Sequence, residues 1–141
     1  MPNFDDIRIG DELPEQYRET SIVQQFLYNA ALWNPHRIHF DARWTREVEG
    51  YPELVVAGPL MGDWLTQLVL AWLGSDGRLA SIEYSNRGIA WVGETLAVSG
   101  RIETLDPETR SAELALAVRN EEGELLVPAT ATVIFRGETA E

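Results

Sequence analysis

The segment GPLMGDWLTQLVLAWL, residues 58–73, limits the fold of this chain more than any other stretch. Written on a helix, it is apolar on nearly every side, and a helix with this pattern lies buried in a protein core. Its polar residues are Asp63, Thr66 and Gln67. The segment is too short to span a bilayer, and the proline at its second position suits the first turn of a helix. We therefore expect a central core helix that starts at Gly58 and closes at Gly74.

After this helix the hydrophobic pattern changes to the alternation that is typical of β-strands. Strands are predicted at residues 80–84, 95–105, 112–119 and 126–135. In the third of these strands, Leu114, Leu116 and Val118 share one face, so the strand has one side to bury. An antiparallel meander wrapped around one apolar helix predicts an α+β fold. No repeat or linker divides the chain, so residues 1–141 are expected to form a single domain.

Two shorter elements are predicted ahead of the core helix. The polar residues 1–19 contain turn signals and are expected to contribute a short edge strand. The stretch ETSIVQQFLYNAALW places apolar residues at helical spacing behind a capping Thr20 or Ser21. It predicts a helix of about three turns that ends near Pro35. Both histidines of the chain lie directly behind this helix.

The composition excludes several kinds of chemistry. The chain has no cysteine, and all 11 of its lysine and arginine residues are arginine, so thiolate nucleophiles, disulfides and Schiff-base lysines are excluded. A net charge of −12 would repel the phosphate backbone of nucleic acid, which is therefore not an expected partner. The first residues form no basic, apolar leader, so we expect no membrane association and a cytoplasmic location.

The segment WNPHRIHFD, residues 33–41, contains both histidines of the chain. An unperturbed imidazole titrates at about pH 6.5, which suits a histidine to proton transfer near neutral pH. The same residues also fit a turn behind a helix, because Asn34-Pro35 is a common helix stop and Asp41 could cap the next turn. From the residues alone, a catalytic site and a capped turn both remain open.

This segment and two later ones, EVEGYPELVVAGPLMGDWL and YSNRGIAWVGETLAVSGRI, resemble the MaoC-like hydratase/dehydratase branch of the hot-dog fold. The resemblance is to (R)-specific enoyl-CoA hydratases and 3-hydroxyacyl-thioester dehydratases. It implies a hot-dog domain, in which an antiparallel sheet wraps around a central helix. It also implies reversible addition of water to an enoyl thioester, an acyl-CoA of fatty acid metabolism, with no metal and no further cofactor. A homodimer or a hot-dog heteromer is implied too, because a second hot-dog unit helps to form the active site.

The resemblance assigns catalytic roles to three residues. His39 falls where the family has its catalytic histidine, two positions before an aspartate. Gly58 falls at the glycine that opens the central helix, where its N–H can polarise the thioester carbonyl. Asn34 lies five positions before His39, where many members have a catalytic aspartate. Because an amide cannot exchange a proton, we expect Asn34 to hold and orient the reacting water.

Further residues are expected to bind substrate or to shape its site. They are His36, Arg37, Asp41, Ala57, Trp33 and Arg87. The arginines suit the phosphates of coenzyme A and Trp33 suits an acyl pocket, although each also fits an ordinary surface or core role. Asp41 is expected to orient an imidazole. Ala57 stands where relatives often have a histidine, so one hydrogen-bond donor is expected to be missing there.

Two alternatives to an active hydratase stay open. Hot-dog thioesterases often carry a carboxylate on the central helix, and Asp63 lies on that helix, where a buried carboxylate would need a partner. A simpler explanation for Asp63 is its favourable position near the positive end of the helix. The chain also fits a non-catalytic subunit that completes the pocket of an active hot-dog partner, because it lacks the usual Asp/His pair.

Overall fold

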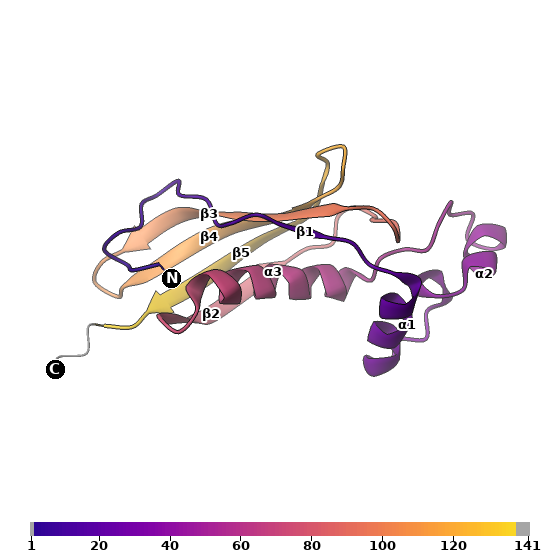
Figure 1. Ribbon diagram of the computed structural model, residues 1–141, viewed down its shortest axis with the longest axis horizontal. Coiled ribbons are helices and arrows are strands. Elements are labelled where there is room, and N and C mark those ends of the chain that lie inside the picture. The colour runs from indigo at the N-terminus through magenta and orange to yellow at the C-terminus, as the bar shows by residue number, and fades with distance from the viewer. Residues whose placement is uncertain (1, 138–141) are drawn as a thin grey trace.

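The computed structural model describes residues 2–137 of the chain. Five antiparallel strands form one curved sheet in the order β1-β3-β4-β5-β2 (Figure 1). The strands are β1 (Gln16–Arg18), β2 (Gly77–Tyr84), β3 (Leu96–Asp106), β4 (Ser111–Arg119) and β5 (Leu125–Phe135). Helix α3 (Gly58–Leu73) lies along one face of this sheet. The predicted α+β fold, a sheet around a central helix, is therefore confirmed.

The hydrophobic core lies between α3 and the sheet. Alternate residues of β4 and β5 point toward the helix, as the period of two in their sequences predicts. These buried strand residues are Ala112, Leu114, Leu116, Val118, Val127, Ala129, Ala131, Val133 and Phe135. On the helix, Leu65 and Val69 are fully buried, whereas Leu70 is 50% exposed. The expectation of an α3 buried on nearly all sides is thus wrong for its outer face.

Strand β2 lies at the sheet edge opposite β1 and pairs with β5. The predicted meander therefore holds for β3, β4 and β5, while the chain crosses the sheet between β2 and β3. An alternating pattern establishes that a strand exists and which side it buries, but not which strand it pairs with. The predicted N-terminal edge strand is confirmed as β1.

Three short elements gather beyond one end of the sheet, beside the start of α3 and away from both termini (Figure 1). They are α1 (Ile22–Ala31), the 3₁₀ turn η1 (Arg37–His39) and α2 (Ala42–Glu47), the last of which was not predicted. Ser21 caps α1, and its hydroxyl accepts a hydrogen bond of 3.1 Å from the Gln24 N–H. The helix ends earlier than predicted, because Trp33 adopts a left-handed backbone conformation with φ of 56°.

Helix α1 turns its polar side inward. Gln25 and Asn29 are buried, one helical turn apart. The apolar residues of the helix are exposed: Ile22, Val23, Phe26 and Leu27. Gln25 therefore contacts residues that follow η1, Asn29 Nδ2 donates back to the Gln25 carbonyl, and the apolar stripe faces solvent. No helix in the described part of the chain is both long and apolar enough to cross a membrane.

Candidate active site

His39 is the most deeply buried of the predicted site residues that can transfer a proton, with 8% of its surface exposed. It ends η1, and its Nδ1 lies 2.7 Å from the carbonyl oxygen of Val55. Since a carbonyl oxygen only accepts hydrogen bonds, this contact places the imidazole proton on Nδ1 and leaves the lone pair on Nε2. Burial lowers the pKa of the His39 imidazole below its usual value; the bond to the Val55 carbonyl opposes this shift, and the nearby His36 adds to it. The ring is therefore held as a neutral base.

Gln25 lies between His39 and the start of α3. Its Nε2 donates to the Val55 carbonyl and lies 3.3 Å from His39 Nδ1. Its Oε1 accepts a hydrogen bond of 3.3 Å from the N–H of Ala57, the residue before Gly58. One side chain thus contacts both the candidate base and the N–H of the N-cap residue of α3. Gln25 was not predicted from the sequence; the available signal was a glutamine and an asparagine four positions apart within a mostly apolar helix.

Gly58 opens α3 without a side-chain cap, and no described residue accepts a hydrogen bond from its N–H. The Asn86 side chain occupies the space beside it. A Cβ added at Gly58 would lie 2.4 Å from Asn86 Nδ2, which is why this position suits glycine. The backbone on either side of Asn86 is fixed to β5, by Ser85 N–H to Pro128 and Arg87 N–H to Leu126. Asn86 is a second residue that sequence analysis missed, because it lies far from the histidines in the chain.

Asn34 and His36 build the turn that leads to His39. The Asn34 Oδ1 accepts a hydrogen bond of 3.1 Å from the His36 N–H, and His36 Nδ1 accepts one of 3.4 Å from the Ile38 N–H. The rings of His36 and His39 are 5.9 Å apart between centroids, and His36 is exposed. The structure thus brings the three predicted residues together, with His36 at the rim and Asn34 supporting the turn.

Arg37 and Asp41 are engaged with each other and with α2. The Asp41 carboxylate caps that helix at the Trp44 N–H and accepts a 2.7 Å hydrogen bond from Arg37 Nη2. The bond from Trp44, followed by the one from Arg37, lowers the pKa of the Asp41 carboxyl. Asp41 therefore caps a helix and does not contact the His39 imidazole, contrary to the expectation that it would orient one. The Arg37 guanidinium also lies over the Trp44 ring, 5.1 Å from its centre.

Trp33 and Arg87, both predicted to bind substrate, are exposed. Trp33 is 89% exposed and lines an apolar groove of about 360 Å³ together with Asn34. The rest of its lining is Phe26, Asn29, Ala30, Pro35 and Phe40.

Arg87 borders a separate shallow hollow beside β2 and forms no ion pair with any residue in the range 2–137. Its guanidinium is available to an anion, whereas that of Arg37 is already paired.

Asp63, the residue of the thioesterase alternative, is exposed on α3. Its Oδ2 accepts a hydrogen bond of 2.7 Å from the Tyr28 hydroxyl on α1. Burial of Tyr28, together with this bond, raises the pKa of its hydroxyl. The carboxylate thus has a partner and joins α1 to α3, so the buried carboxylate considered from the sequence is not found.

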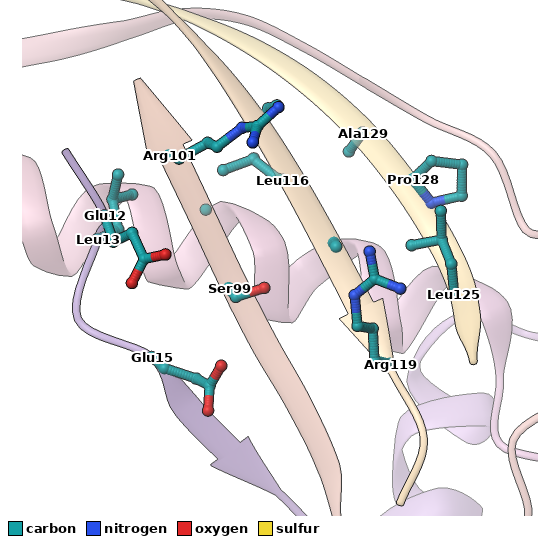
Figure 2. A pocket seen from close by; sticks show the side chains of 13 residues that line it. Glu12, Leu13, Glu15, Ser99, Arg101, Leu116, Arg119, Leu125, Pro128 and Ala129 are labelled. Carbon is teal, nitrogen blue, oxygen red and sulfur yellow. The ribbon is translucent and has the colours of Figure 1, made fainter. Parts of the chain in front are cut away.

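A hollow of about 460 Å³ lies on the outer face of the sheet, with α3 behind it (Figure 2). Charged side chains at its margins include Glu12, Glu15, Arg101 and Arg119. None of the predicted site residues lines it. Within residues 2–137, no three side chains are grouped so that they could hold a metal ion. Gln25 instead links His39 to Ala57, the residue before Gly58, and Asn86 lies beside Gly58; this is the arrangement that suits catalysis.

The curved sheet around a central helix, together with the buried His39, is the arrangement that the resemblance to MaoC-like hydratases and dehydratases implies. The sequence model of the hydroxyacyl-thioester dehydratase type 2 family matches residues 11–92, more than half of the 141 residues. The chain belongs to this family, and the predicted resemblance is confirmed.

Two curated relatives match part of the chain. Mesaconyl-C(4)-CoA hydratase of Chloroflexus aurantiacus is 46% identical over 43 residues, which are 30% of this chain and 15% of that protein. The mitochondrial hydroxyacyl-thioester dehydratase type 2 of Saccharomyces cerevisiae is 30% identical over 71 residues, 50% of this chain and 25% of that protein. The matches thus span a quarter or less of the length of these relatives.

Solved structures share the fold over nearly the whole chain. The (R)-hydratase from A. caviae involved in PHA biosynthesis has a TM-score of 0.85 at 16% identity, and the match covers 93% of this chain and 98% of that one. A MaoC-like dehydratase has a TM-score of 0.85 at 24% identity, and the match covers 96% of this chain and 42% of that one. At these identities the likeness establishes the fold.

Proposed function

We propose that the protein reversibly hydrates an enoyl thioester to a 3-hydroxyacyl thioester, with acyl-CoA as its substrate. The observation that carries the proposal is the buried His39, whose Nδ1 bond to Val55 leaves Nε2 as a base and which Gln25 joins to Ala57, the residue before α3. Hydratase and dehydratase names among the relatives support the same reaction. A neutral imidazole suits this reaction because one group must take a proton from water and then return one to carbon.

In the hydration direction, His39 Nε2 takes a proton from water as the water oxygen bonds to the β-carbon of the enoyl group. The electron pair of the carbon–carbon double bond moves toward the thioester, and negative charge develops on its carbonyl oxygen. The free Gly58 N–H, at the positive end of α3, stabilises this charge. The proton held by His39 is then delivered to the α-carbon, which restores the neutral imidazole.

Two amides complete the proposed reaction. Asn86 Nδ2, beside Gly58, supplies a second donor to the thioester oxygen, in place of the histidine that is absent at Ala57. Asn34 orients the water through its amide oxygen, because Oδ1 accepts one bond from the His36 N–H and retains a second lone pair. Arg87, exposed and unpaired among the described residues, is assigned to a coenzyme A phosphate.

The working form is proposed to be a homodimer or a hot-dog heteromer. The exposed apolar stripe of α1 supports this assignment, because an isolated chain would leave Ile22, Val23, Phe26 and Leu27 in water. Complexes between hot-dog chains also occur among the structures with this fold. A cytoplasmic location and a role in fatty acid metabolism remain predictions from the sequence.

The test is hydration of crotonyl-CoA by the purified protein, followed as loss of the enoyl thioester absorbance while free thiol is measured in parallel. We expect hydration without thiol release, and a loss of about 100- to 10,000-fold in rate for His39→Ala. His36→Ala, whose ring is exposed at the rim, should lose less of the rate than His39→Ala, because His36 is not the proposed base. Thiol release that depends on Asp63 would instead assign a thioesterase.

A further inference from the structure

Gln25 is a fully buried polar side chain, with 0% of its surface exposed, on a helix whose apolar residues face outward. A buried amide is unfavourable unless its hydrogen-bonding groups are satisfied. Here both ends are satisfied by the residues around the candidate site, Val55 and Ala57. A leucine at this position would fill the space without needing these partners, so the polar side chain calls for an explanation other than packing.

The surrounding bonds fix the orientation of the Gln25 amide. The Ala57 N–H is a donor and therefore faces Oε1, and the Val55 carbonyl is an acceptor and therefore faces Nε2. His39 Nδ1 donates to the same Val55 carbonyl. The amide thus shares one acceptor with the imidazole and, through its other end, binds the N–H of Ala57, the residue that precedes Gly58.

We infer that Gln25 is a positioning residue that joins the base His39 and the charge-stabilising start of α3 into one rigid unit, an assignment that rests on the proposed hydratase function. The Ala57 N–H belongs to the N-cap residue of α3, which has no side-chain cap of its own. Gln25, on another helix, supplies the acceptor for the N–H of this N-cap residue. The direction of the Gly58 N–H and the orientation of the His39 ring therefore depend on the same side chain.

Gln25 also influences protonation of His39. Its amide hydrogens carry partial positive charge, and Nε2 lies 3.3 Å from Nδ1 and competes for the Val55 carbonyl. Both effects disfavour the imidazolium. His36 is the titratable side chain that lies near this ring, and it also lowers the pKa of His39. Removing the Gln25 amide should therefore make His39 easier to protonate, which a residue with a purely structural role would not do.

The test compares Gln25→Met, which keeps the size and removes the amide, with Gln25→Glu, which keeps the shape and replaces the amide nitrogen by oxygen. Gln24→Met is the matched control, because Gln24 is exposed on the same helix. We measure kcat and KM on crotonyl-CoA, thermal unfolding, and the titration of both imidazoles by ¹⁵N NMR. For Gln25→Met we expect kcat to fall by about 100-fold with KM little changed, since small misplacements of reacting groups have effects of this size.

The NMR titration separates this inference from the proposed function, because it needs no turnover. Both Gln25 variants should raise the pKa of His39 relative to the unsubstituted protein, and Gln24→Met should not. An unchanged His39 titration in the two folded Gln25 variants would overturn the positioning role, whether or not the protein hydrates crotonyl-CoA. If the unsubstituted protein is inactive while His39 titrates as expected, the proposed reaction fails and the contact role of Gln25 stands.

Discussion

At the scale of single residues, the environment of His39 predicts how activity depends on pH. Burial lowers the pKa of its imidazole below the usual value of about 6.5, so the neutral base persists in more acidic solution than a free imidazole would. The acid limb of kcat/KM for hydration should therefore lie below pH of about 6.5. A rate profile measured on crotonyl-CoA checks this, and an acid limb above that value would contradict the described surroundings of the ring.

The same shift affects stability. The folded protein binds fewer protons at His39 than the unfolded chain does between the lowered pKa and about 6.5. The contribution of His39 to the free energy of unfolding is therefore fully present above about pH 6.5. This contribution is lost as the pH falls toward the pKa of His39 in the folded protein. The difference between the unsubstituted protein and His39→Gln in urea unfolding should change in this pH window and stay constant above it.

Asn86 provides a second prediction at this scale. If its amide stabilises the thioester oxygen, Asn86→Ala should lower kcat by about 100-fold, a common effect of losing one such donor. Gly58→Ala should also lower kcat, because its new Cβ would displace the Asn86 amide. The double variant Gly58→Ala/Asn86→Ala removes this clash as well as the amide. Recovery of activity in the double variant would show that Asn86 only packs against Gly58, contrary to its proposed role.

At the scale of elements, Trp33 ends α1 in a backbone conformation that favours glycine. A side chain in the left-handed region costs about 1–2 kcal/mol, and Trp33 gains little from burial because it is exposed. Trp33→Gly should therefore leave the free energy of unfolding unchanged or raise it by up to about 1 kcal/mol. The control Trp64→Ala, in the core, should lower it by about 3–5 kcal/mol in the same urea titration. A comparable loss for Trp33→Gly would contradict this account.

Helix α1 also shows where inference from sequence reaches its limit. Its existence and a cap at Thr20 or Ser21 were predicted from the local pattern, and the structure shows Ser21 as the cap. The side that the helix turns toward the core was not predicted, because a stripe of apolar residues indicates only that the stripe is covered in the working protein. In the described chain the buried side is that of Gln25 and Asn29. The contacts of Gln25 with Val55 and Ala57 join residues 30 or more positions apart, and no local pattern reports such contacts.

At the scale of the whole molecule, the core helix and the inward faces of β4 and β5 could be predicted because each carries its own hydrophobic period. The position of β2 at the far edge of the sheet could not be predicted, because it is determined by the pairing of complete strands. Family membership followed from the residues around His39 and Gly58. The roles of the individual site residues stay predictions, because the departure at Asn34 removes the usual carboxylate partner.

The exposed stripe of α1 gives a prediction for assembly. If a second hot-dog unit covers this stripe, Leu27→Glu should weaken association, because Leu27 is 60% exposed and a charge would become buried in the interface. Leu70→Glu on α3, where the leucine is 50% exposed, is the control on another surface. Sedimentation velocity should find smaller particles for Leu27→Glu alone. An unchanged particle size would place the interface elsewhere.

The central claim, that this site adds water across an enoyl thioester, is tested most directly by mass spectrometry of the thioester after incubation of crotonyl-CoA with the protein. Hydration predicts a product heavier than the substrate by one water, with the thioester bond intact and its formation dependent on His39. Release of free coenzyme A, or unchanged substrate at high protein concentration, would contradict the claim.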